Sequence, residues 1–420
     1  MKPLKVKNKL QDTPNQDPIF NVTCNLSSGK EIKCADPRAI RSLVALMDMA
    51  AVMGGAASHW GGPSALAEIN SALHALVFAD AKDKKKPWHE LYNVINDAGH
   101  CENGLYALKA LYGYADLSLE TLKGFRSIES KLTGHGEAHL FAEGVMLSNG
   151  PLGSAMGPSQ GLALADSLSK TDRVTVTTIS DGASMEGEAK EAFAAIPGMA
   201  AKGQVAPYVL IVSDNNTKLS GRVDEQSFSM APSFAAMETL GWKVLKLEKA
   251  HDLTECLKVL SEAIEIAKAN PQQPVMVHAK TIKGYGVKKT AESASGGHGF
   301  PLKKPAELTE FINEIYTTNN AYESNKEIPE EINNWTKELI AKDQPKAAST
   351  GPKKVKVQEG VSKALIKKRK EGLPVISVTS DLPGSTGLAA FHKECPDSFI
   401  DVGIAESNMV SVATGLSKQG

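Results

Sequence analysis

The sequence predicts an α/β protein that contains a parallel sheet, and three neighbouring stretches support this fold class. Residues 173–179 are rich in valine and threonine, which favour strands. Residues 208–212 form an almost wholly apolar run, which is typical of a strand buried on both faces of a parallel sheet. Strong helix formers fill residues 186–195 between them. This alternation predicts strand ends that meet at one edge, where open α/β sheets bind ligands.

The remaining elements continue this alternation in order. Residues 1–35 are polar and irregular and predict an extension without a site. A first domain over residues 36–300 is predicted to add helices at 37–53, 65–78 and 253–268, and strands at 242–248 and 274–282. A charged, helical stretch that ends in lysine and proline predicts a linker over residues 301–354. A helix at 355–369 and a strand at 374–379 begin a second α/β domain, which we expect to be incomplete over residues 355–420.

Composition and charge exclude several classes of partner. The 420 residues include 47 basic and 48 acidic side chains, so no excess charge points to a nucleic acid or a membrane surface. No apolar run approaches the length of a membrane span, and the N-terminus has no apolar signal core. Five scattered cysteines without a C-x-x-C pair favour a reducing compartment over disulfides or a zinc site. We therefore expect a cytoplasmic protein without nucleic-acid or membrane partners.

Polar residues at the ends of the two central strands predict a metal–diphosphate site. Asp181 could give the metal a carboxylate, Asn215 an amide oxygen and Thr217 a backbone carbonyl. Mg²⁺ prefers such hard oxygen ligands, usually with one or two carboxylates and with phosphate oxygens completing its shell. Gly182 leaves room for a phosphate, and the N-terminus of the following helix favours negative charge. The local pattern alone fits an ordinary turn equally well, with Asp181 as a helix cap.

The longer stretch resembles the thiamine-diphosphate signature of transketolases. S-D-G-A-S-M-E-G-E-A, at residues 180–189, is similar to the family's G-D-G-x-x-M-E-G-x-x, and N-N follows after a spacer. The resemblance implies thiamine diphosphate as the cofactor, with Mg²⁺, or Ca²⁺ or Mn²⁺, as the metal. It also places Glu186 in an acidic cluster at the cofactor site, near a dimer interface. Two features depart from the family: Ser180 replaces a glycine, and the spacer is a few residues longer at residues 197–207.

Four histidines beside glycine-rich turns extend the resemblance. A lone histidine in a turn is usually just exposed, but these four follow the order of the family's motifs. They are His59 in A-S-H-W-G-G-P, His100 in N-D-A-G-H, His135 in T-G-H-G-E and His298 in S-G-G-H-G-F-P. The resemblance implies that His59, His135 and His298 face the substrate as catalytic residues, and that His100 and His298 bind the cofactor. Trp60 stands where the family has a proline, in the expected pocket wall.

A loop and a glutamate of the second domain complete the predicted site. Gly150, Pro151 and Leu152 precede a helix of small residues and match the family's G-P-L-G loop, which binds the cofactor. G-I-A-E-S-N-M resembles the family's pyrimidine-binding domain, and Glu406 matches the catalytic glutamate that bonds the aminopyrimidine and activates the cofactor. Ser385, with a lysine among residues 353–356, lies roughly where the family binds a substrate phosphate.

The resemblance implies a transketolase, which transfers a two-carbon ketol unit between sugar phosphates in the pentose phosphate pathway. It covers the chain from about Pro37 onward but only the first two-thirds of a transketolase, so we expect a missing C-terminal part or a separate C-terminal subunit. It also implies a homodimer in which Glu406 of one subunit reaches cofactor held by its neighbour. Two alternatives stay open: another thiamine-diphosphate enzyme, such as deoxyxylulose-phosphate synthase or a 2-oxoacid dehydrogenase component, or a non-catalytic half that binds diphosphate.

Overall fold

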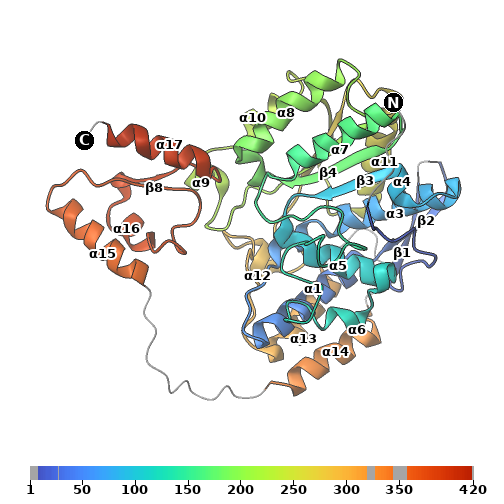
Figure 1. Cartoon of the computed structure of the whole chain (residues 1–420). Coiled ribbons are helices and arrows are strands. Elements are labelled where there is room, and N and C mark those ends of the chain that lie inside the picture. Colours follow the sequence, from blue (N-terminus) through green and yellow to red (C-terminus); the bar gives the residue numbers. More distant parts are fainter. Residues whose placement is uncertain (1–7, 27, 319–326, 344–356, 419–420) are drawn as a thin grey trace.

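Five parallel strands form the central sheet of the first α/β unit in this computed structural model, which describes residues 8–26, 28–318, 327–343 and 357–418. In order across the sheet, the strands are β3 (Tyr92–Asn96), β4 (Val174–Ser180), β5 (Tyr208–Asp214), β7 (Val275–Lys280) and β6 (Lys243–Leu247) (Figure 1). Every neighbouring pair is parallel. The predicted fold class is therefore confirmed, and the carboxyl ends of the strands meet at one edge.

The alternation of side chains along β5 explains why this strand is apolar over residues 208–212. Val209 and Ile211 belong to the core on one face of the sheet, whereas Tyr208, Leu210 and Val212 belong to the core on the other. All five are at most 1% exposed. A strand covered on both faces needs apolar side chains in both directions, as the sequence predicts.

Helices cover both faces of this sheet. One face packs against α7 (Met156–Ser169), α8 (Gly187–Ala200) and α10 (Ala231–Ala235). The other packs against α1 (Pro37–Met53), α3 (Ala67–Lys84), α5 (Glu102–Leu111) and α11 (Leu253–Ala269) (Figure 1). The helix predicted at 65–78 is divided, with α2 (Gly61–Ala65) preceding α3. Short helices in the connections are α4 (Trp88–Leu91), α6 (Leu119–Leu122), α9 (Val223–Gln226) and α12 (Lys288–Ala291).

Helix α8 continues through Pro197, where the sequence predicts that the helix has ended. Proline has no N–H and therefore leaves the carbonyl four residues earlier, that of Phe193, without its helical partner. The indole Nε1 of Trp242 donates a hydrogen bond to this carbonyl at 2.7 Å. A distant side chain thus satisfies the backbone group that the proline leaves unpaired, and a local sequence pattern does not reveal it.

The N-terminal region differs from the irregular extension that the sequence predicts. Within its described part, β1 (Asn21–Asn25) and β2 (Glu31–Ala35) form an antiparallel hairpin. Cys24, Ile32 and Cys34 lie in the main core, and Ser71 Oγ of α3 donates to the carbonyl of residue 35 at 2.6 Å. The hairpin is short, with one buried residue in β1 and three in β2, so its signal is hidden in a polar background.

The segment predicted as a linker contains two packed helices. They are α13 (Leu308–Thr317) and α14 (Glu330–Ala341). Phe311 of α13 and Trp335 of α14 are buried in the same core as α1. Residues 319–326 and 344–354 of this segment lie outside the described residues. Most of the described residues of this segment therefore pack against the first unit. The exact domain boundaries stay a prediction.

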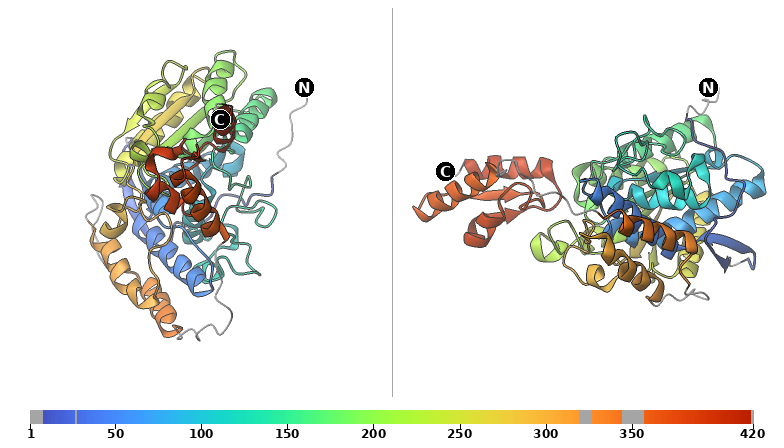
Figure 2. Two further views of the ribbon diagram at one scale, coloured as in Figure 1. Left: turned by 90° about the vertical axis from the view of Figure 1, so that its left-hand side faces the viewer. Right: turned by 90° about the horizontal axis from the view of Figure 1, so that it is seen from below.

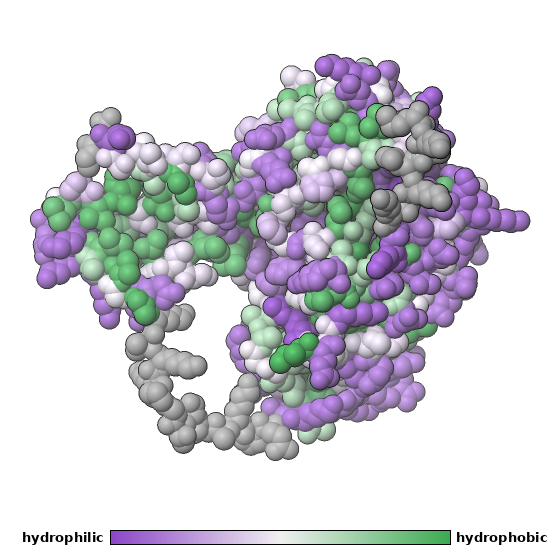
Figure 3. Space-filling model, in the orientation of Figure 1, coloured by the Kyte–Doolittle hydropathy of each residue, from purple (hydrophilic) through white to green (hydrophobic). Residues whose placement is uncertain are grey.

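The second α/β unit is small. It comprises α15 (Val357–Lys370), β8 (Ser377–Thr379), α16 (Ala389–Glu394), β9 (Phe399–Asp401) and α17 (Glu406–Ser417), with β8 and β9 paired in parallel (Figure 2). Strand β8 is shorter than the strand predicted at 374–379. None of the residues of α17, all of which the structure describes, is buried. Exposed apolar side chains gather on this unit, including Val361, Ile376 and Val410 (Figure 3).

Among the helices of the described ranges, none combines the length and the apolar character that a membrane span requires.

Candidate active site

A cavity of about 360 Å³ lies at the sheet edge where β3, β4, β5 and β7 end. Most of the residues predicted for the site line it: His59, His100, His135, Gly150, Leu152, Gly182, Asn215, Thr217, His298 and Glu406. Pro151, Asp181, Glu186 and Ser385 are not among its lining residues. The structure therefore brings residues from seven separate motifs to one cavity, while their individual roles stay predictions.

Asp181 lies under the cavity, where it fixes the turn after β5. Its side chain is 1% exposed, and its Oδ1 accepts a hydrogen bond from the backbone N–H of Gly182 at 2.9 Å. Its Oδ2 accepts from the backbone N–H groups of Asn215 at 3.0 Å and Asn216 at 2.5 Å. Burial, with the neighbouring carboxylate of Asp214, raises the pKa of Asp181 to about 6. A nearby cation would stabilise the ionised form that burial disfavours.

The amide oxygen of Asn215 is the observation that tests whether a metal fits. Asn215 Oδ1 is buried and has no hydrogen-bond partner among the described residues. An unpaired buried oxygen is costly, and Mg²⁺ binds such oxygens. Thr217 Oγ1 donates to the carbonyl of Asn215 at 2.9 Å and so shapes the loop that carries both residues. Within the described ranges no three His, Cys, Asp or Glu side chains form a metal site; the predicted ligand set contains one carboxylate, which suits a cation shared with phosphate oxygens.

Gly182 provides the space that a diphosphate would need. A Cβ atom at this position would lie 2.9 Å from Ile404 Cδ1, so a larger residue would collide with the second unit. Ser180, which replaces the family's glycine, also lines the cavity, and its Oγ accepts a hydrogen bond from the backbone N–H of Ala183 at 3.1 Å. The departure at Ser180 therefore adds a hydrogen bond to the turn. The residues present fit a diphosphate that binds with a divalent cation.

The four predicted histidines lie together around the cavity. The ring centroid of His59 is 5.4 Å from that of His100, 5.3 Å from that of His298 and 6.2 Å from that of His135. Burial lowers the pKa of all four, to about 4 for His59. All four are therefore neutral at pH 7, and each imidazole has one donor and one acceptor nitrogen. Such a group can take or give a proton at a substrate hydroxyl.

Lys283 is a site residue that the sequence analysis missed. It is 6% exposed, lines the cavity beyond the end of β7, and its Nζ lies 2.9 Å from His298 Nδ1. Burial lowers its pKa to about 8, although the charge of Asp181 opposes that shift. Its signal was available in the sequence, because K-G-Y-G follows a predicted strand and the carboxyl ends of parallel strands share one edge.

Glu406 reaches the cavity from the second unit, where it is the first residue of α17. The carboxyl group of Glu186 lies beside that of Glu406. Burial, together with this contact, raises the pKa of Glu186 to about 8. At neutral pH Glu186 therefore holds a proton. One chain already places Glu406 at the cavity, and the dimer stays a prediction.

Two residues singled out in the sequence lie away from the cavity. Trp60 is fully buried; its Nε1 donates to Thr290 Oγ1 at 3.2 Å and its ring contacts that of Phe311 edge-on at 4.8 Å. Its departure from the family therefore changes the core beneath the site rather than the cavity wall. Ser385 is exposed in the turn after β8. The lysines among residues 353–356, which were expected to act with Ser385, lie outside the described residues.

A buried ion cluster joins the loop after β5 to the second unit. The side chain of Lys218 is fully buried, and its Nζ lies 2.7 Å from Asp381 Oδ1 and 2.6 Å from Asp401 Oδ2. The backbone N–H groups of Leu219 and Ser220 donate to the Asp381 carboxylate at 3.0 and 3.2 Å. The loop that carries the predicted metal ligands Asn215 and Thr217 therefore also contacts the second unit.

These features define a class of protein: an α/β protein with a cavity at the carboxyl edge of a parallel sheet, whose lining residues fit a diphosphate bound with a cation. Residues 36–371 match the family model described as the thiamine diphosphate binding domain of transketolase, and residues 353–420 match that of the pyrimidine binding domain. The chain belongs to the transketolase family.

Individual relatives agree with this assignment. The chain is 32% identical over 265 residues to a transketolase of Bacillus subtilis, an alignment that covers 61% of this chain and 37% of that protein. It is 25% identical over 448 residues to transketolase 1 of Escherichia coli, covering 94% of this chain and 64% of that protein. The chain therefore spans less than two-thirds of the length of either relative.

Solved structures show the same fold. A transketolase from Leishmania mexicana superposes with a TM-score of 0.54 at 20% identity, covering 88% of this chain and 61% of that one. A transketolase from Campylobacter jejuni gives a TM-score of 0.52 at 23% identity, with the same coverage of 88% and 61%. At this identity the likeness concerns the fold, and the site is argued from its own residues.

Proposed function

We propose that this chain acts in ketol transfer between sugar phosphates, as a transketolase does. The observation that carries the proposal is the set of four neutral histidines around one cavity, beside Asp181, Asn215 and Glu406. A sugar phosphate presents several hydroxyl groups, and neutral imidazoles can hydrogen-bond these groups and move their protons. Neither a simple diphosphate-binding role nor decarboxylation of a small oxoacid needs four of them.

The cofactor that fits the cavity is thiamine diphosphate with Mg²⁺, or with Ca²⁺ or Mn²⁺. Asp181, Asn215 and Thr217 would hold the cation, and His100, Lys283 and the Gly150–Leu152 loop would hold the diphosphate. Glu406 would bond the aminopyrimidine ring. When bound, thiamine diphosphate supplies a nucleophilic carbon for attack on a ketose carbonyl. The protein binds and orients the reactants, excludes water, and holds protons on His59, His135 and His298.

The proposal is tested by comparing two reactions. The chain is loaded with thiamine diphosphate and Mg²⁺ and supplied either with xylulose 5-phosphate and an aldose phosphate, or with pyruvate. We expect transfer of the two-carbon unit in the first case and no release of carbon dioxide in the second. The assay is run on the chain alone and on any complex that copurifies with it. Carbon dioxide release without ketol transfer would overturn the proposal in favour of another thiamine-diphosphate enzyme.

The proposal extends to assembly and location. We propose a homodimer that acts on sugar phosphates in the cytoplasm, completed by a C-terminal part or by a separate C-terminal subunit. The exposed apolar side chains of the second unit support the existence of a further contact there. The compartment rests on the free cysteines, since the structure describes all five as unbonded and buried.

Replacement of single histidines should separate substrate handling from cofactor binding. His59→Ala, His135→Ala and His298→Ala are each expected to slow ketol transfer by about 10²- to 10⁴-fold, the range of general acid–base catalysis. His100→Ala should instead raise the concentration of thiamine diphosphate needed for half activity. Steady-state kinetics and thermal unfolding of each variant measure both effects. His139→Ala is the matched control, because its side chain is 69% exposed and pairs only with Glu137 on the surface. Normal kinetics in all four variants would show that these histidines have no such roles.

Lys283 should make cofactor affinity depend on pH. Its pKa is about 8, so the charged fraction of this lysine falls as the pH rises through 8. Because a diphosphate binds the charged form better, calorimetry should show affinity decreasing from pH 7 to pH 9. Lys283→Met should bind about 10- to 100-fold more weakly at pH 7, as expected for a lost hydrogen bond to a charged group, and should lose this part of the pH dependence. The exposed Lys289→Met serves as control; an unchanged pH profile in Lys283→Met would contradict the role.

A further inference from the structure

The segment over residues 123–155 contains no helix or strand, although the structure describes all of it. It nevertheless carries His135 and the Gly150–Leu152 loop to the cavity. Loops longer than about 12 to 15 residues without regular structure are uncommon in compact domains. Because no ladder of backbone hydrogen bonds orders this segment, other contacts must determine where His135 and Gly150 lie.

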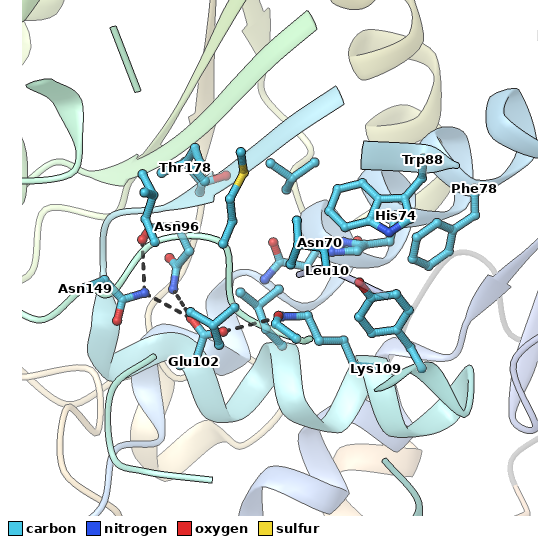
Figure 4. Close-up of a pocket in the computed structure, with 18 residues that line it drawn as sticks. Leu10, Asn70, His74, Phe78, Trp88, Asn96, Glu102, Lys109, Asn149 and Thr178 are labelled. Atoms are coloured by element: carbon cyan, nitrogen blue, oxygen red, sulfur yellow. Dashed lines mark hydrogen bonds and ion pairs between the residues drawn. The ribbon is translucent and has the colours of Figure 1, made fainter. Parts of the chain in front are cut away.

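Glu102 provides the first of these contacts. It is the first residue of α5, is 2% exposed, and lies two residues after His100. Its Oε2 accepts hydrogen bonds from Asn96 Nδ2 at 3.0 Å and from Asn149 Nδ2 at 3.1 Å (Figure 4). Asn149 immediately precedes Gly150. One buried carboxylate therefore joins the end of β3, the start of α5 and the loop that approaches the cavity.

Asn149 extends this network to His135. Its Oδ1 accepts from the backbone N–H of Gly136 at 2.7 Å, and its own N–H donates to the carbonyl of Gly136 at 2.9 Å. A Cβ atom at residue 136 would lie 3.0 Å from Glu102 Cδ, so the segment passes directly against the carboxylate. Glu102 therefore holds Asn149, which precedes Gly150 in the chain. Asn149 in turn holds Gly136, which follows His135.

Lys109 balances the charge and provides a second attachment. It lies two turns further along α5, is 8% exposed, and its Nζ is 3.5 Å from Glu102 Oε1. The same Nζ donates to the carbonyl of Gly144 at 2.7 Å (Figure 4). The pair borders a small cavity of about 50 Å³ whose lining includes Phe78 and Trp88. In such apolar surroundings an ion pair is retained only with good partners, and removal of one partner is strongly destabilising.

We propose that Glu102 and Lys109 are positioning residues that hold the segment 133–152 against β3 and α5 and thereby set the places of His135 and Gly150 at the cavity. The activity readouts below rest on the proposed function, whereas the exchange measurement does not. Neither side chain of the pair touches substrate or cofactor in this assignment. Displacement of a reacting group by about 1 Å can cost about 10²-fold in rate, so a distant pair can have a large kinetic effect.

The test uses Glu102→Gln, Lys109→Met and the double variant in the full chain. Hydrogen–deuterium exchange is measured by mass spectrometry for peptides over residues 133–152, and for peptides over β4 and β5 as internal reference. Glu143→Gln is the matched control, because this glutamate lies in the same segment with its side chain exposed. We expect faster exchange over residues 133–152 in all three test variants, unchanged exchange in the reference strands of the double variant, and no change in the control.

The double variant separates positioning from stability. Removing both charges at similar side-chain volume should restore most of the thermal stability that either single variant loses. The double variant should not restore the places of His135 and Gly150. The kcat/KM for ketol transfer should therefore remain about 10²-fold lower than in the wild type, and the cofactor should bind more weakly, because the Gly150 loop is displaced. A double variant with restored stability and wild-type exchange over residues 133–152 would overturn the proposal. If neither the wild-type chain nor its complex with the proposed C-terminal subunit shows ketol transfer, the proposed function fails, while the exchange result still decides the positioning role.

Discussion

Asp181→Ala is expected to abolish metal-dependent binding of thiamine diphosphate. The variant removes the one carboxylate assigned to the cation, and it also removes the acceptor that holds the backbone N–H groups of Asn215 and Asn216. Loss of a group outside the metal shell already costs about 10- to 100-fold in metal affinity, so the loss of a ligand should cost more. Isothermal titration calorimetry with Mg²⁺ present measures the affinity directly.

Two variants calibrate this result. Asn215→Ala should weaken binding to a smaller degree, because a neutral amide oxygen stabilises a dication less than a carboxylate does. Asp172→Asn is the control, since this exposed carboxylate precedes β4, at the opposite end of the strand from Asp181. Unchanged affinity in Asp181→Ala, with Mg²⁺ still required, would show that the cation binds elsewhere.

Glu406→Gln is expected to keep the affinity for thiamine diphosphate and Mg²⁺ and to lose activation of the bound cofactor. Glu406 lies in the second unit, whereas the predicted cation ligands Asp181 and Asn215 belong to the first, so the diphosphate contacts should survive the change. The amide cannot exchange a proton with the aminopyrimidine as a carboxylate can. Exchange of the cofactor C2 proton for deuterium, followed by NMR after rapid quenching, should therefore slow by about 10²- to 10⁴-fold. Fast C2 exchange in this variant would reject the assignment of Glu406.

Mixing two inactive variants shows which subunit supplies Glu406. If each site combines Asp181 of one subunit with Glu406 of the other, a mixed dimer of Asp181→Ala and Glu406→Gln contains one intact site. Activity should then return on mixing after subunit exchange. If both residues of a site come from one chain, as in the described structure, no intact site forms and the mixture stays inactive. Sedimentation at the assay concentration establishes that dimers are present.

The sequence predicts most of the sheet, because its central strands carry strong local patterns. Residues 208–212 carry apolar side chains toward both faces of the sheet, and Val174–Ser180 is rich in β-branched residues, so burial and propensity agree there. The extent of α8 could not be predicted, because the contact that completes the helix at Pro197 comes from Trp242, far along the chain. The hairpin of β1 and β2 was not predicted, because both strands are short and fewer than half of their residues are buried, which leaves only a weak local pattern.

The candidate site was predictable where glycine turns mark the ends of strands. The histidines and the Asp181 turn stand in such motifs, and the structure brings them to one cavity. Lys283 was not assigned, because its place after a predicted strand identifies it as a site residue only when that strand is known to end at the cavity. Glu102 was not predicted either, since a buried carboxylate is recognised by its partners, Asn96 and Asn149, and these contacts exist only in the folded chain.

The ion cluster of Lys218 would couple two equilibria at the cavity, because one loop takes part in both. The same loop would bind a cation through Asn215 and Thr217 and already contacts the second unit through Lys218. Any ligand that orders this loop favours the docked second unit, and by thermodynamic linkage the docked unit raises the affinity for that ligand by the same factor. Cation and second unit would thus act as heterotropic effectors of each other. Binding of the cation and docking of the second unit would then occur together. Without its cation, the chain would not hold Glu406 at the cavity.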